Sequence, residues 1–198
     1  MEIKSSDVKA LRGETGAGMM DCKKALVESG GDIEIAKKIL REKGITVAQK
    51  KSSRAANEGI IDVYIHPGNR VGAIIEVNCE TDFVARNQEF RDFVHDLTLQ
   101  VAAANPLYVS RNDVPQSLIE NKTDIYIRQA IAEGKSKAVV DNIITGRLEK
   151  FYAEVCLLEQ PFIKDQEKTV GNLLIDLISR IGENIEIKRF CRYQLGER

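Results

Sequence analysis

This chain of 198 residues lacks long apolar runs and lacks a recognisable targeting peptide. A membrane-spanning helix needs about 20 consecutive apolar residues, so none is predicted. Residues 1–7 have neither the basic and then apolar pattern of a secretory signal nor the Arg-rich, acid-poor pattern of a transit peptide. We therefore expect a cytoplasmic protein that has no membrane partner.

Metal-binding side chains are also few. The two histidines and four cysteines are scattered and form no C-x-x-C pair: His66, His95, Cys22, Cys79, Cys156 and Cys191. Structural zinc sites take four such ligands, usually in closely spaced pairs. The sequence thus predicts no metal and no cofactor, and in a reducing compartment we interpret the cysteines as small core residues.

A strong charge of either sign is missing as well. The net charge is -1 and the pI is about 6.2, which argues against capture of nucleic acid by bulk electrostatics. Residues 1–54 nevertheless carry twelve Lys and Arg against eight Asp and Glu. Lys50, Lys51 and Arg54 crowd the end of this segment, and we interpret them as a solvated linker.

What is present first is a series of helix signals in residues 1–54. Ser6 and Asp7 are suited to cap a helix that stops near the glycines at 16 and 18. A second helix is predicted from Met19 to Ser29, and a third from the cap Asp32 to Gly44. We expect these helices to form a small N-terminal domain, residues 1–54.

The apolar period then changes from helical to alternating, which is typical of strands. Strands are predicted at 61–65 and 71–79, joined by a turn at 66–70, and again at 185–193 with Ile185, Ile187 and Cys191 on one face. Helices are predicted at 87–104, at 169–181 and within 111–158, where Gly134 marks a break and Gly146 weakens the pattern. For residues 55–198 we expect an α+β core domain.

The order of these elements favours a three-stranded antiparallel sheet with helices packed on one face. The first two strands are adjacent in sequence and the third arrives at the end. Such a sheet leaves its other face and its edges uncovered. A second copy of the chain would cover them, so a homodimer is expected.

The segment after the second strand combines an acidic and an aromatic residue. Strand alternation ends at Glu80 and the next helix begins at Asn87, so 81–86 is predicted to be a tight turn that holds Phe83 and Val84. Periodicity alone favours Phe83 as a plug on the end of the sheet. The alternative is a wedge for another protein, in which Phe83 fills a pocket and Asp82 takes a buried hydrogen bond or charge.

Two long motifs bear on this choice. Residues 76–86, EVNCETDFVAR, and residues 11–26, LRGETGAGMMDCKKAL, resemble the two signatures of the elongation factor Ts family. Residues 146–151 and 160–162 are also similar to that family. The resemblance implies a ubiquitin-associated-like three-helix domain, a linker and an α+β dimerisation domain.

In that family the factor binds elongation factor Tu and promotes GDP release. The resemblance implies that one turn intrudes into the nucleotide domain of elongation factor Tu and disturbs its magnesium site; that turn comprises Thr81, Asp82, Phe83 and Val84. It implies a docking surface for the same domain: Arg12, Met19 and Met20. The chain looks like the short form of the family, for which we expect a homodimer with Cys191 near the two-fold axis.

Two other classes are weighed beside this one. An enzyme would use Cys22 as a nucleophile beside Lys23 and Lys24, but no histidine can be assigned to activate it. The sequence Gly16-Ala17-Gly18 lacks the Gly-Lys-Ser/Thr ending of a phosphate loop. An RNA-binding module would use the basic residues near position 51, but that segment offers no aromatic platform. We therefore predict a binding protein and not an enzyme.

Overall fold

The computed structural model describes residues 3–134 and 137–197, whose contacts divide them into two compact units. The first unit runs to Ile60 and adds Val77–Arg91 and Leu173–Glu186. The second unit contains Ile61–Glu76, Asp92–Asn172 and the residues from Ile187 onward. Within the described ranges no helix is both long and apolar enough to cross a membrane.

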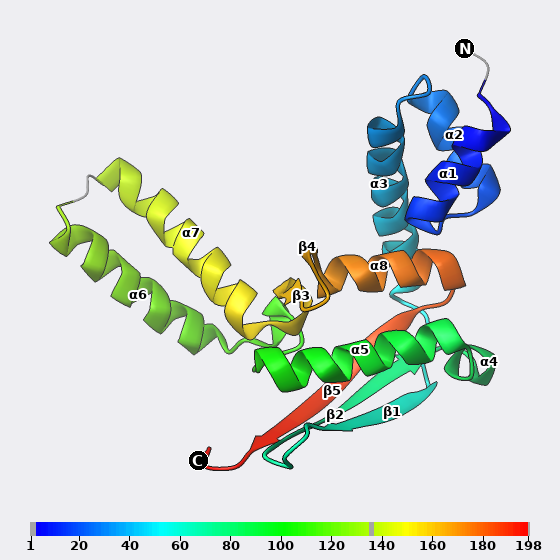
Figure 1. The fold of residues 1–198 in the computed structure, drawn as a ribbon. Helices are drawn as coiled ribbons and strands as arrows, with labels where there is room; N and C mark the ends of the chain where they lie inside the picture. Colours follow the sequence, from blue (N-terminus) through cyan, green and yellow to red (C-terminus); the bar gives the residue numbers. More distant parts are fainter. Residues whose placement is uncertain (1–2, 135–136, 198) are drawn as a thin grey trace. The chain divides into compact units, whose positions relative to one another are not determined.

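The N-terminal helices of the first unit pack around a small core (Figure 1). They are α1 (Ser5–Thr15), α2 (Met19–Glu28) and α3 (Ile33–Lys51). The core side chains are short or medium-sized: Val8, Leu11, Cys22, Ala25, Leu26 and Ala36. As predicted, the Asp32 carboxylate caps α3, accepting a hydrogen bond from the Ile35 N–H at 3.0 Å.

Two predicted helix ends are wrong. Helix α1 begins at Ser5 after Lys4, which has no side-chain cap, so Ser6 and Asp7 lie inside its first turn. Helix α3 does not stop at Gly44 but continues to Lys51. Gly44 is buried, and a Cβ added there would lie 3.6 Å from Ile175 Cγ2. This packing offsets the low helix propensity of glycine.

The predicted three-stranded antiparallel sheet and α+β class are confirmed. Its strands are β1 (Glu58–Ile65), β2 (Val71–Cys79) and β5 (Ile185–Gln194), in the order β1-β2-β5. Gly59 has φ of +147°, and a Cβ there would lie 2.2 Å from the Val77 carbonyl oxygen. Only glycine fits this close approach of two strands.

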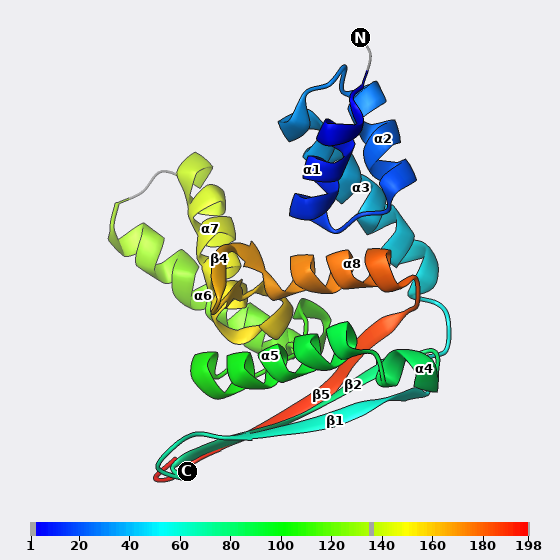
Figure 2. The ribbon, with the colours of Figure 1, turned by 45° about the vertical axis from the view of Figure 1, so that its right-hand side comes forward.

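Helix α5 (Gln88–Ala104) covers one face of the sheet, as Figures 1 and 2 show. In the second unit, Val94, Leu97 and Val101 of α5 are fully buried. Asp62 of β1 accepts a hydrogen bond from Thr98 of α5 at 2.8 Å. This amphipathic helix was predicted from its apolar spacing, with almost the same bounds.

The opposite face carries exposed apolar side chains, and we call it the outer face. Its members come from all three strands: Ile61, Val63, Ile65, Ile74 and Tyr193. Val63, Ile65 and residues 69–74 and 193–195 line a groove of about 430 Å³ there. Cys191 is exposed, whereas Ile185 and Ile187 are buried, so the prediction that these three share a face is wrong. The alternation shifts before Arg192, whose Nε donates to the Ala102 carbonyl oxygen of α5.

The region predicted as helical over 111–158 contains two helices, α6 (Gln116–Ala132) and α7 (Lys137–Val155). Helix α6 ends before Gly134, whose φ is +71°, so the predicted break is confirmed. Gly146 does not interrupt α7. Short 3-10 turns flank the pair: η1 (Arg111–Asp113) and η2 (Leu157–Glu159).

Two short strands, β3 (Pro161–Phe162) and β4 (Asp165–Thr169), form an antiparallel hairpin that the sequence did not predict. The exposed, mostly polar run of β4 gives no alternating apolar signal. Helix α8 (Val170–Ile181) follows directly and begins one residue after its predicted start. The predicted domain boundary after residue 54 stays a prediction.

Candidate functional site

The Thr-Asp-Phe-Val segment lies in a one-turn helix, α4 (Asp82–Ala85), and not in an irregular turn. Thr81 is its N-cap, and its hydroxyl oxygen accepts a hydrogen bond from the Val84 N–H at 3.4 Å. Ala85 is buried and faces the unit's interior. The helical twist turns Phe83 away from that interior, and its side chain is 80% exposed. The interpretation of Phe83 as a plug on the sheet is therefore wrong.

Asp82 lies beside Phe83, and we call these two residues the α4 tip. The Asp82 carboxylate contacts the Arg86 guanidinium at 3.0 Å, one helical turn later. Both side chains are largely in solvent, at 47% and 77% exposed. Because an exposed ion pair of this kind contributes little free energy, Asp82 is able to exchange Arg86 for another partner.

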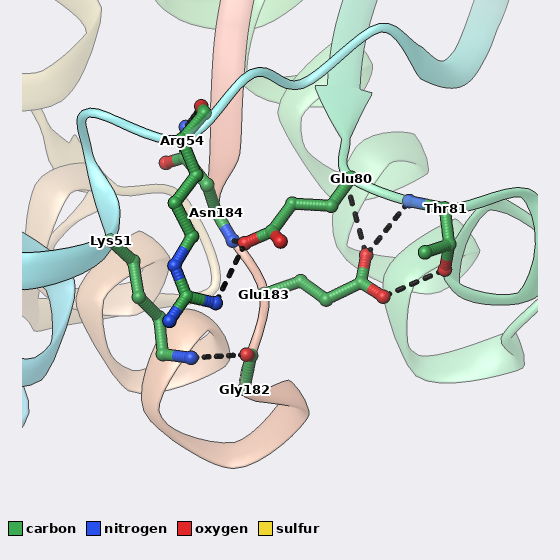
Figure 3. A network of polar contacts seen from close by, with 7 residues as sticks. All are labelled: Lys51, Arg54, Glu80, Thr81, Gly182, Glu183 and Asn184. Atoms are coloured by element: carbon green, nitrogen blue, oxygen red, sulfur yellow. Dashed lines mark hydrogen bonds and ion pairs between the residues drawn. The ribbon is translucent and has the colours of Figure 1, made fainter.

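The residues just before α4 are held by one carboxylate (Figure 3). Glu183 Oε2 accepts hydrogen bonds from the backbone N–H groups of Glu80 at 3.1 Å and Thr81 at 3.0 Å. Glu183 Oε1 accepts the Thr81 hydroxyl at 2.7 Å. Hydrogen bonds to a charged acceptor are stronger than neutral ones, so this cluster fixes the backbone at the start of α4.

The Glu80 side chain in turn contacts Asn184, the residue that follows Glu183. Its carboxylate accepts the Asn184 N–H at 2.6 Å and contacts the Arg54 guanidinium at 3.5 Å. The Asn184 N–H and, to a smaller degree, the Arg54 charge lower the pKa of the Glu80 carboxyl below its ordinary value. Glu80 is therefore ionised at neutral pH.

The turn from Gly182 to Asn184, which we call the 182–184 turn, also holds the end of α3. Lys51 Nζ donates to the Gly182 carbonyl oxygen, and Asn184 Nδ2 donates to the Arg54 carbonyl oxygen at 2.8 Å (Figure 3). This basic segment was interpreted as a solvated linker. Lys50 and Arg54 are indeed exposed, but Lys51 ends a helix, and both Lys51 and Arg54 have partners in the first unit.

The other predicted site residues lie on α1 and at the start of α2. Arg12 is exposed, and so are Met19 (39%) and Met20 (63%). Neither methionine belongs to the helical core. These residues share the first unit with α4 but lie on different elements. Between α1 and α2, Gly16 lies against Arg180 of α8, whose Nε donates to Glu89 at 2.6 Å.

Comparison with known proteins identifies the relatives of this chain. The family model described as "Elongation factor TS" matches residues 24–197. The elongation factor Ts of Thermoanaerobacter sp. (strain X514) is 57% identical over 195 residues, which cover 98% of this chain and 96% of that protein. The chain belongs to the elongation factor Ts family. The elongation factors Ts of Alkaliphilus oremlandii and Alkaliphilus metalliredigens are 56% and 51% identical, and each match covers all of this chain.

This membership assigns the chain to the elongation factors of protein biosynthesis, as the motifs at 11–26 and 76–86 predicted. In this chain the other reactive groups are poorly placed for chemistry. Burial, with the nearby Glu183 carboxylate, raises the pKa of the Cys79 thiol to about 11. Burial raises the pKa of Cys156 to about 11 as well. Cys22 is fully buried in the N-terminal helical core. Within the described ranges no three His, Cys, Asp or Glu residues are placed to hold a metal ion.

Sequence reasoning missed the role of the 182–184 turn, which was interpreted only as a link between helix and strand. A signal existed in the sheet order. In an antiparallel pair, the start of β5 must lie beside the end of β2, so residues 182–184 must lie beside residues 80–81. An acid in that turn, Glu183, is then within reach of the exposed N–H groups at the start of α4.

Proposed function

We propose that this chain binds elongation factor Tu in its GDP-bound form and promotes release of GDP. The observation that carries the proposal is the exposed ring of Phe83 on a helix that is anchored at its start. A large apolar side chain costs free energy when it stays in water, and such anchors dominate protein interfaces when a partner supplies a pocket. Asp82 adds a charge that is only loosely paired.

In the proposed mechanism the α4 tip enters the nucleotide domain of elongation factor Tu, supported by Thr81 and Val84. A bulky ring between packed helices shifts them discretely, because close-packed interiors do not deform smoothly. Displacement of the partner's magnesium ion removes charge that neutralises the GDP phosphates. Each tenfold gain in GDP release requires about 1.4 kcal/mol of contact that favours the nucleotide-free state.

The docking surface in this proposal is formed by Arg12, Met19 and Met20. Their exposure supports it, since the unbranched methionine side chain adapts to an irregular apolar surface. The division of labour follows the predicted domains: residues 1–54 dock, and residues 55–198 carry the α4 tip. The factor remains unchanged by the exchange, so we propose a cytoplasmic binding protein and not an enzyme.

We also propose that a second copy of the chain covers the outer face of the sheet. Three strands contribute exposed apolar side chains to that face, among them Val63 and Tyr193, around the 430 Å³ groove. Cys191 is exposed and contacts Tyr193, which supports its position near the two-fold axis. Sedimentation at micromolar concentration tests this proposal, and a protein that is only monomeric contradicts it.

The exchange mechanism is tested by the rate at which labelled GDP leaves elongation factor Tu. With Phe83→Ala at saturating concentration, we expect the stimulated rate to fall by about hundredfold, which corresponds to the loss of an interface anchor. The circular dichroism and the midpoint of unfolding should stay near those of the wild type, because the ring makes no core contact. Full exchange activity in this variant would contradict the mechanism.

The other two classes have tests of their own. Turnover of GTP by the chain alone would support an enzyme, and steeply salt-dependent RNA binding would support an RNA-binding module.

A further inference from the structure

We propose that Glu183 is a positioning residue for exchange: its carboxylate holds the start of α4 so that Asp82 and Phe83 project in one fixed orientation. This inference rests on the proposed function of α4. It concerns a residue that lies 100 positions after Phe83 in the sequence. Its proposed role requires no contact with the partner.

The need for such a residue follows from the size of α4. A helix of four residues has too few internal hydrogen bonds to stabilise itself in water. Its N-cap bond, from the Val84 N–H to the Thr81 hydroxyl, is long at 3.4 Å. Burial of Ala85 fixes one side of the turn, but a single small side chain leaves the direction of the helix poorly determined. The orientation must come from outside the helix.

The geometry of Glu183 supplies it. Its two carboxylate oxygens take three donors from two consecutive residues, Glu80 and Thr81 (Figure 3). Two backbone N–H groups fix the direction of the chain as it enters α4. The third donor is the Thr81 hydroxyl, whose proton then points to Glu183 and whose lone pair is left for the Val84 N–H. Glu183, Thr81 and Val84 thus form one chain of hydrogen bonds, in which each bond polarises the next.

The 182–184 turn is itself held in place. Lys51 binds its first residue, and its last residue, Asn184, is bound by Glu80 and by the Arg54 backbone. Asn184 is also buried. The backbone on both sides of Glu183 is therefore held in place, and the Glu183 carboxylate in turn restrains the start of α4. A preorganised tip favours exchange because less conformational entropy is lost when it enters the partner.

Three variants separate geometry from charge. Glu183→Ala removes all three acceptor contacts, and ordering the loosened residues on binding should weaken insertion by about tenfold. Glu183→Asp keeps the charge but shortens the reach by one methylene, so it should behave like the alanine variant. Glu183→Gln keeps the length; its oxygen is able to accept both N–H groups while its amide donates to the Thr81 hydroxyl. It should stay within about threefold of the wild type.

The experiment measures the GDP release rate at saturating factor and the Kd for elongation factor Tu with and without GDP. For Glu183→Ala we expect a release rate about tenfold lower, a Kd for the nucleotide-free partner about tenfold higher, and a nearly unchanged Kd for the GDP-bound partner. The coupling between the two ligands would fall by that factor. Amide hydrogen exchange should become faster at Val84, and it should stay unchanged in α1, α2 and α3. Glu167→Ala, an exposed acid in β4, serves as the matched control.

The outcomes distinguish this inference from the proposed function. If Phe83→Ala leaves GDP release intact, the exchange mechanism itself is wrong. If Phe83→Ala abolishes stimulation but Glu183→Ala releases GDP like the wild type, with Val84 protected, only the positioning role is wrong. Equal weakening of both Kd values would indicate general destabilisation and would also contradict it. If the alanine variant does not fold, the GDP release rates with the other two variants decide. An aspartate variant as active as the glutamine variant overturns the inference.

Discussion

The α4 tip and the outer face of the sheet both expose apolar side chains, but they do so in different ways. At the α4 tip one aromatic ring, Phe83, stands 80% exposed on a single helical turn. On the outer face the exposed side chains are spread over three strands around a groove. The first is a point of contact, whereas the second is an area.

This difference indicates two kinds of partner. A single ring on an anchored turn is suited to a pocket in a different protein, where a few residues carry most of the binding free energy. A broad apolar face built from regular strands is suited to a copy of itself, because a two-fold axis repeats every contact. The polar groups are distributed accordingly: those of the 182–184 turn anchor α4 and leave Phe83 free.

The largest expected effect is the loss of self-association through the outer face. Val63→Asp places a carboxylate in the apolar area, twice in a symmetric dimer, and should weaken self-association by about thousandfold. Sedimentation velocity at micromolar concentration should then show a monomer. The matched variant Phe83→Asp puts the same charge on the α4 tip and should leave the sedimentation coefficient unchanged. If both variants dissociate, or neither does, the two surfaces do not have the separate roles proposed here.

Much of the fold could be predicted from sequence because its signals are local. The alternation over 71–79 and the apolar spacing of 87–104 gave β2 and α5 with nearly their observed bounds. Local signals failed where distant contacts decide. Gly44 looked like a helix end, but burial beside α8 keeps it helical, and the polar β4 pairs only because β3 lies next to it.

The candidate site shows the same division. The segment around Phe83 was found from its motif. The exposure of the Phe83 ring was the alternative that periodicity alone did not favour. Glu183 could not be found in that way, because its function depends on β5 lying beside β2 and not on any local pattern. The partners of Lys51 and Arg54 were missed for the same reason, because they are more than 25 residues away in sequence.

A smaller effect is expected on the stability of the polar contacts before α4, to which the charge of Glu80 contributes. In the folded protein the pKa of Glu80 lies below its ordinary value, so the ionised carboxylate stabilises the fold above that ordinary value. This stability is lost as the pH falls through the folded-state pKa. Glu80→Gln should therefore lower the midpoint of thermal unfolding at pH 7. The difference from the wild type should shrink progressively below about pH 4.5. A constant difference from pH 7 to pH 3 would show that the charge of Glu80 is unimportant.

The smallest effect concerns Arg86, which contacts Asp82 at the α4 tip. Because this ion pair is exposed and lies within one helix, Arg86→Ala should change the free energy of unfolding by less than about 0.5 kcal/mol. If Asp82 leaves Arg86 when it meets the partner, the loss of Arg86 removes a competitor, and GDP release should stay within about twofold of the wild-type rate. A tenfold fall would mean that Arg86 itself contacts elongation factor Tu, and the point of contact would then extend beyond Asp82 and Phe83. A normal rate, beside a large loss for Phe83→Ala, would confine the exchange function of α4 to its exposed ring and the acid next to it.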